Sequence, residues 1–174
     1  MVAPSPRRGK SSEDNNAEPL MGKILGTVEQ YLVTEGWNYE PVSGRNALQC
    51  GIKGQNSDYR MFFDVDEEAE LLLLFVVIQA NTPEGRRSAL SEFIIRANWG
   101  LRVGNFELDL RDGEVRYKVS IDVEGGQLMP KMIENMIGAG VSTLDRYFPG
   151  IMAVSYAGEG AESAITQIEQ AEGP

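Results

Sequence analysis

Five carboxylates gather around one predicted turn, and their type suggests cation chemistry. Asp64, Asp66, Glu67, Glu68 and Glu70 lie within seven positions, and Asp64 and Asp66 share one face of a predicted strand. Carboxylates suit hard cations, but such sites need more oxygen ligands at defined spacing, and this loop lacks the glycine and distal glutamate of an EF-hand. We favour the alternative, a charged hairpin tip that keeps an apolar strand soluble, and we predict no metal site.

The other reactive side chains form no recognisable catalytic group. Glu107 and Asp109 each gain a cationic partner in a predicted hairpin, and a paired, exposed carboxylate is a poor general acid. Cys50 lies on the apolar side of a predicted strand, and the chain has no histidine to act as its base, so we expect a small buried hydrophobe. Arg86 and Arg87 open a helix, where we expect them to be solvated or to meet a partner's carboxylate. We therefore predict no enzyme activity and no cofactor.

Composition restricts the partners and the compartment. The 174 residues hold 16 Lys and Arg against 26 Asp and Glu, which gives a net charge of −10 and a pI near 4.5. Nucleic acids and anionic membranes need clustered cations, so we expect neither as a partner. One cysteine excludes an internal disulfide. No run is long and apolar enough to span a bilayer, and we expect a cytoplasmic protein.

We predict a disordered tail over residues 1–19 and a single domain over residues 20–174. The tail is rich in Pro, Ser and Asn and holds almost no large aliphatic residue. It cannot bury enough apolar surface to offset the entropy of ordering, and it lacks the apolar segment of a signal peptide.

Hydrophobic periodicity places the elements that carry these residues. A second helix is predicted to begin with Thr82 as N-cap and Pro83 at its first position, and to end near Asn98. A break at Gly138 and Gly140 is predicted to separate two late helices. The remaining predicted helices cover 20–35, 127–137, 141–156 and 161–170, and the first four predicted strands cover 37–42, 47–53, 59–65 and 70–79.

Asp112-Gly113 predicts a β-hairpin with a two-residue type I′ turn. Its strands cover 105–111 and 114–123. The turn sets the pairs as 107–118, 109–116 and 111–114 on the charged face, and as 106–119, 108–117 and 110–115 on the apolar face.

Hairpin connections predict an antiparallel sheet and the α+β class. Positions 71–78 are apolar on both faces, although a strand in a half-solvated sheet should alternate. A helix of the same chain or a partner subunit must therefore cover its second face. The candidate dimer or partner surface comprises Leu73 and Phe75 on this strand, with Leu90, Phe93 and Ile94 on the second helix.

Three segments carry a family resemblance: GNFELD at 104–109, DGEVRY at 112–117 and LDRYFP at 144–149. Asn98 and the pattern of Glu162, Ala164 and Ile165 agree with it. Together they resemble the YbjN family, described as bacterial sensory-transduction regulators. The resemblance covers about residues 20–169. It implies a type III secretion chaperone-like fold, an antiparallel sheet flanked by helices in the order α-β-β-β-α-β-β-α, usually dimeric and without known catalytic residues.

Two functions from different classes remain. The leading hypothesis is a non-enzymatic protein-binding module, chaperone-like or regulatory, that acts as a homodimer and holds a protein or peptide segment. The resemblance, the two-sided apolar strand and the acidic, histidine-free composition favour it. The alternative is a small-molecule or divalent-cation-binding regulatory domain, which depends on Asp64 and Asp66 alone.

Overall fold

Six antiparallel strands form one sheet in the order β1-β2-β3-β4-β6-β5. The computed structural model describes residues 22–170, so the predicted tail over 1–19 lies outside the described residues. The strands are β1 (Tyr39–Pro41), β2 (Ala47–Lys53), β3 (Asp58–Asp66), β4 (Leu71–Ile78), β5 (Asn105–Leu108) and β6 (Val115–Asp122).

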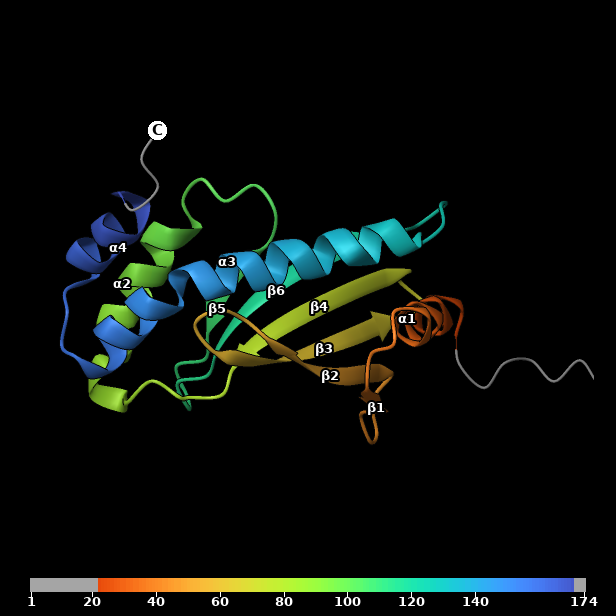
Figure 1. Cartoon of the computed structure of the whole chain (residues 1–174), viewed down its shortest axis with the longest axis horizontal. Helices are drawn as coiled ribbons and strands as arrows, with labels where there is room; N and C mark the ends of the chain where they lie inside the picture. The colour runs from red at the N-terminus through yellow and green to blue at the C-terminus, as the bar shows by residue number, and fades with distance from the viewer. Residues whose placement is uncertain (1–21, 171–174) are drawn as a thin grey trace, which may run out of the picture.

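Helices pack on one face of this sheet (Figure 1). They are α1 (Lys23–Thr34), α2 (Arg87–Asn98), α3 (Pro130–Tyr156) and α4 (Ala161–Gln170), and a 3-10 turn (Glu84–Arg86) precedes α2. Helix α3 runs along β4 and β6, while α4 packs against α2 and α3. The predicted α+β class is confirmed. Compared with the order α-β-β-β-α-β-β-α that the resemblance implies, the chain has two additional elements, the short edge strand β1 and the helix α4.

The core lies between the sheet and the helices. Alternate residues of β3 and β4 point into it and are buried, among them Tyr59, Phe63, Leu72 and Leu74. The predicted break in the late helices is wrong, because α3 continues through both glycines. A Cβ at Gly140 would lie 3.0 Å from the Val76 side chain, so the residue permits a close approach of α3 to the sheet.

The predicted N-cap of the second helix is also wrong. Thr82 is buried and its hydroxyl lies 3.2 Å from the Ser155 hydroxyl of α3, while its amide donates to the Gly113 carbonyl at 2.8 Å. Pro83 instead precedes the 3-10 turn as its N-cap, and α2 starts at Arg87. The threonine side chain therefore serves a contact with α3 rather than the start of its own helix.

The β5–β6 hairpin forms in a register two residues from the predicted one. The pairs are 105–118, 106–117, 107–116 and 108–115, and residues 109–114 make a wider loop. Thr82 binds the carbonyl of Gly113, and Arg87 donates to the carbonyls of Leu110 and Arg111. These contacts hold the wider loop in place of the two-residue turn. A shift of two keeps every side chain on its predicted face.

Candidate functional site

The face of the sheet opposite the helices carries an apolar stripe. Leu71, Leu73, Phe75 and Val77 point outward from β4 and are partly exposed, while the residues between them are buried. Phe62 of β3 pairs with Phe75 and extends the stripe sideways. Within the described part of the chain the helices contact the other face. We call these five residues the open-face stripe.

The predicted candidate surface divides into two parts. Leu73 and Phe75 belong to the open-face stripe. Leu90, Phe93 and Ile94 instead lie in the core of the chain, and the ring of Phe93 meets that of Tyr147 edge-on with centroids 6.3 Å apart. The structure therefore corrects the prediction for these three residues, whose helical stripe packs against the chain itself.

An ion-pair network partly shields the stripe. The Arg116 guanidinium lies 4.2 Å from the centroid of the Phe75 ring and donates to Glu107 at 2.8 Å. Lys118 also pairs with Glu107. Burial alone would raise the pKa of Glu107, but hydrogen bonds from Lys118 and Arg116 outweigh it, and the pKa lies below the usual value. Glu107 is thus an ionised partner of two cations and is unsuited to donate a proton.

The acidic turn has structural partners. Asp64 pairs with Arg45, and Asp66 accepts the amides of Glu68 and Ala69 at 3.1 and 2.9 Å. Glu67 accepts two amides in the first turn of α1, at 2.9–3.1 Å. The residue before α1 is glycine and offers no side-chain cap, so Glu67 replaces it from the β3–β4 turn. In the described residues, no three His, Cys, Asp or Glu side chains are placed to hold a metal ion.

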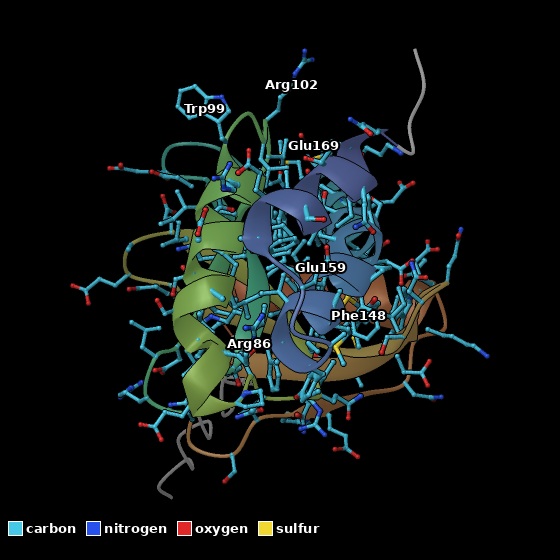
Figure 2. All side chains as sticks on the ribbon, turned by 90° about the vertical axis from the view of Figure 1, so that its left-hand side faces the viewer. Arg86, Trp99, Arg102, Phe148, Glu159 and Glu169 are labelled. Carbon is cyan, nitrogen blue, oxygen red and sulfur yellow. The ribbon has the colours of Figure 1, made fainter. Side chains whose placement is uncertain are left out.

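Cys50 and the two arginines at the start of α2, Arg86 and Arg87, also have defined contacts. Cys50 is buried, and burial raises the pKa of its thiol to about 11, so the thiol stays protonated. Arg86 donates to the carbonyls of Val154 at 2.7 Å and Glu159 at 2.8 Å, and so binds the C-terminal end of α3 (Figure 2). Arg87 binds three carbonyls around the hairpin loop. The expectation that both arginines are solvated or meet a partner is therefore corrected.

Sequence reasoning missed Asp145, a buried carboxylate on α3. It accepts the Tyr59 hydroxyl at 2.7 Å, the Asn56 amide at 2.9 Å and the Gln55 amide at 3.1 Å. Burial alone would raise its pKa, but these hydrogen bonds prevail and the pKa lies below the usual value. A Cβ at Gly54 would lie 2.3 Å from the carboxylate. The sequence signal for this buried carboxylate was an acidic residue next to the apolar Leu144 and close to Tyr147 and Phe148.

A second apolar surface lies at the loop that follows α2. Trp99 is 89% exposed, Ile95 71% and Val103 51%. Figure 2 shows Trp99 and Arg102 pointing away from the body of the molecule, and Figure 1 shows this loop on the helical side, opposite the open face. We call Ile95, Trp99 and Val103 the tryptophan tip. Sequence reasoning used this region only to end the helix.

A family model described as "Putative bacterial sensory transduction regulator" matches residues 25–152. The chain belongs to the YbjN family. The three segments that carry the resemblance build the β5–β6 hairpin and the part of α3 that holds Asp145. In this YbjN family member, the three segments therefore contribute to the folded structure of the sheet and of α3.

Solved structures show similar folds at low sequence identity. The crystal structure of YbjN from E. coli, described as "a putative transcription regulator", has a TM-score of 0.54 and 15% identity, over 70% of this chain and 85% of that chain. The HopA1-SchA chaperone-effector complex has a TM-score of 0.47 and 14% identity, over 71% and 90%. The ExsC-ExsE complex has a TM-score of 0.45 and 15% identity, over 71% and 89%.

These likenesses concern the fold alone. No curated protein matches the sequence. Among the described helices of this YbjN family member, none combines the length and apolar character needed to cross a membrane.

Proposed function

We propose that this protein is a non-enzymatic protein-binding module, chaperone-like or regulatory, that acts as a homodimer in the cytoplasm and holds a segment of another protein. The open-face stripe carries the proposal. Burial stabilises apolar surface by about 25 cal/mol per Å², so covering these five partly exposed side chains favours association against its entropic costs. Among the described residues, no helix or loop supplies that cover.

The tryptophan tip supports the part of the proposal in which the protein holds a segment of another protein. Trp is enriched among the residues that dominate binding energy in interfaces, and Trp99 is the most exposed of the large hydrophobic residues in the described chain. Because the tip and the open-face stripe lie on opposite sides of the molecule, one can contact a segment of another protein while the other is covered (Figure 1).

The alternative function, small-molecule or divalent-cation binding, has no observation in its favour. It depended on Asp64 and Asp66, and Arg45 pairs with the first while the second closes a turn.

A site-specific photo-crosslinker tests the proposal. The benzophenone amino acid is placed at position 99 or, as a matched control, at position 33, where Val33 is 56% exposed on α1. In cells that encode the protein, we expect a discrete adduct with one other protein from position 99 only. The adduct protein, purified, should bind the wild-type chain at least tenfold more tightly than Trp99→Ala, with Val33→Ala unchanged. Equal labelling from both positions, or no loss of affinity in Trp99→Ala, would contradict the proposal.

A further inference from the structure

The register of the sheet places charged residues at both ends of the open-face stripe. Arg60 of β3 and Arg116 of β6 pair with Val77 on either side of β4. Asp66 and Asp122 pair in the same way with Leu71 at the other end of β4. The stripe therefore runs from a basic row, in which Glu107 of β5 lies beside Arg116, to an acidic row six residues away, about 20 Å along the strand.

Both rows have capacity for a further partner. Arg60 is exposed and points outward. Arg116 uses its Nε and one terminal nitrogen on Glu107, and its other terminal nitrogen lies 3.9 Å from a Glu114 carboxylate oxygen, but a guanidinium has five N–H donors. Asp66 and Asp122 are exposed, and each uses one carboxylate oxygen on amides of its own turn. The second oxygen of each carboxylate can accept from outside the chain.

Symmetry restricts how two copies of this face can meet. In a face-to-face dimer the two-fold axis lies in the plane between the sheets, and when the strands of the two sheets are aligned it runs along β4 or across it. An axis along β4 places each basic row on the other basic row. An axis across β4 reverses one strand against the other, and it places each basic row on an acidic row. Like charges across an interface are unfavourable, so the charge pattern selects the second arrangement.

We propose that a second copy of this chain covers the open face, with the two β4 strands antiparallel and the two-fold axis crossing β4 at the level of Leu74. This inference rests on the homodimer of the proposed function and specifies its interface. The axis superposes position 71 on 77 and 73 on 75, so the stripes cover one another. It sets Arg60 of one copy against Asp66 of the other, and Arg116 against Asp122.

The central position of the axis follows from the register. The basic row lies at position 77 and the acidic row at position 71, so the midpoint is position 74. The same midpoint centres the apolar residues at 71, 73, 75 and 77. One axis therefore centres the apolar residues of β4 and sets the basic row of each copy against the acidic row of the other.

The face is large enough for a dimer. The four long strands, about 4.8 Å apart and about 3.3 Å per residue, span on the order of 500 Å² in projection. Side-chain relief and the short outer strands enlarge the accessible area, which brings it near the roughly 800 Å² per partner of a standard interface. Sheets that pack face to face with aligned strands are common in proteins.

Sedimentation equilibrium of the full chain tests whether the open face forms the dimer interface. We expect a dimer at micromolar concentration, and Leu73→Asp should raise its dissociation constant by at least 100-fold. Leu73 is on the outer face, so the variant should still fold, which circular dichroism checks. Val33→Asp, exposed on α1, is the matched control and should leave the constant unchanged.

A charge cycle tests the arrangement. Arg60→Glu alone should weaken the dimer about three- to tenfold, since two exposed ion pairs are lost per dimer. Asp66→Asn keeps the oxygen that accepts the turn amides. It should weaken the wild-type dimer, but strengthen the Arg60→Glu dimer, because there it removes the repulsion between the new carboxylate at position 60 of one copy and the carboxylate at position 66 of the other.

Each outcome bears on a stated claim. A monomer at every concentration overturns both this inference and the homodimer of the proposed function. A dimer that Leu73→Asp leaves intact overturns this inference alone, because the copies then meet through another face. Weakening by Asp66→Asn in both backgrounds overturns the antiparallel arrangement. The benzophenone amino acid placed at position 73 should crosslink to a second copy, and an adduct with a heterologous protein or with the chain's own residues 1–21 in its place would overturn this inference.

Discussion

Replacing Asp145 with alanine should lower the free energy of unfolding by about 3–5 kcal/mol. The carboxylate is 8% exposed and lies beneath the β2–β3 turn. It accepts the Tyr59 hydroxyl, the amides of Gln55 and Asn56, and the Asn56 side-chain amide, at 2.7–3.3 Å. The substitution removes all four interactions together.

The magnitude follows from where the four donors lie. Gln55 and Asn56 are exposed, so their donors regain water and each lost interaction costs about 0.5–1.5 kcal/mol. The Tyr59 hydroxyl belongs to a side chain that is 1% exposed, and a buried donor left without an acceptor costs about 1–3 kcal/mol. We expect the total to lie in the lower half of the range that these losses span, at about 3–5 kcal/mol, because the exposed turn can relax toward water.

Urea unfolding followed by circular dichroism measures this loss, with Tyr59→Phe and the double variant completing a cycle. Tyr59→Phe alone should cost about 1–2 kcal/mol, because Asp145 keeps its other donors. The double variant should be more stable than the sum of the single losses predicts, since the orphaned hydroxyl is gone. A loss below about 1 kcal/mol in Asp145→Ala, or strict additivity, would refute the reasoning.

The same carboxylate sets a pH dependence. Its pKa in the folded protein is below the usual value, so the folded protein binds fewer protons than the unfolded chain does near pH 4. The contribution of Asp145 to stability is therefore complete above about pH 4 and is lost as the pH falls through the folded pKa. Asp145→Asn should have a flatter stability profile below about pH 4, and an unchanged slope would contradict this assignment.

Three further predictions concern single positions. Glu67→Ala should lower the unfolding free energy by about 1–2 kcal/mol, measured by urea unfolding, because the amides at the start of α1 lose their acceptor. Gly113→Ala should lower the thermal midpoint by several degrees or more, since its φ is 86° and the new Cβ would lie 2.1 Å from the Thr82 carbonyl oxygen. Cys50 should react with a maleimide at about pH 8 only as fast as the chain unfolds, and fast labelling of the folded protein would contradict its burial and raised pKa.

Local sequence patterns predicted most of the elements. The alternation at 47–53 and 59–65 marks strands whose one face is buried, and β2 matches its predicted bounds while β3 extends one residue at each end. The helical spacing of Ala164, Ile165 and Ile168 likewise marks α4. These patterns succeed because a half-buried element must repeat its apolar residues with its own period.

Contacts between distant segments were beyond such patterns. The hairpin register depends on Thr82 and Arg87, more than twenty residues before the loop they hold. Leu90 and Phe93 resemble interface residues in sequence, since core and interface share a composition, and only the packing of α2 assigns them to the core. The stripe on β4 could be recognised from the local pattern, because a strand that is apolar on both faces needs a second element or a partner to cover its second face.

The capping of α1 by Glu67 also bears on the order of folding. Glu67 lies 43 residues after the first amide it accepts, in the tight turn between β3 and β4. Helix α1 is synthesised first, yet its first-turn amides gain their acceptor only when that later hairpin has formed. During synthesis the twelve residues of α1 therefore remain a marginal helix until the chain past position 67 has emerged. Native-state hydrogen exchange should find the first turn of α1 and the β3–β4 turn opening as one unit.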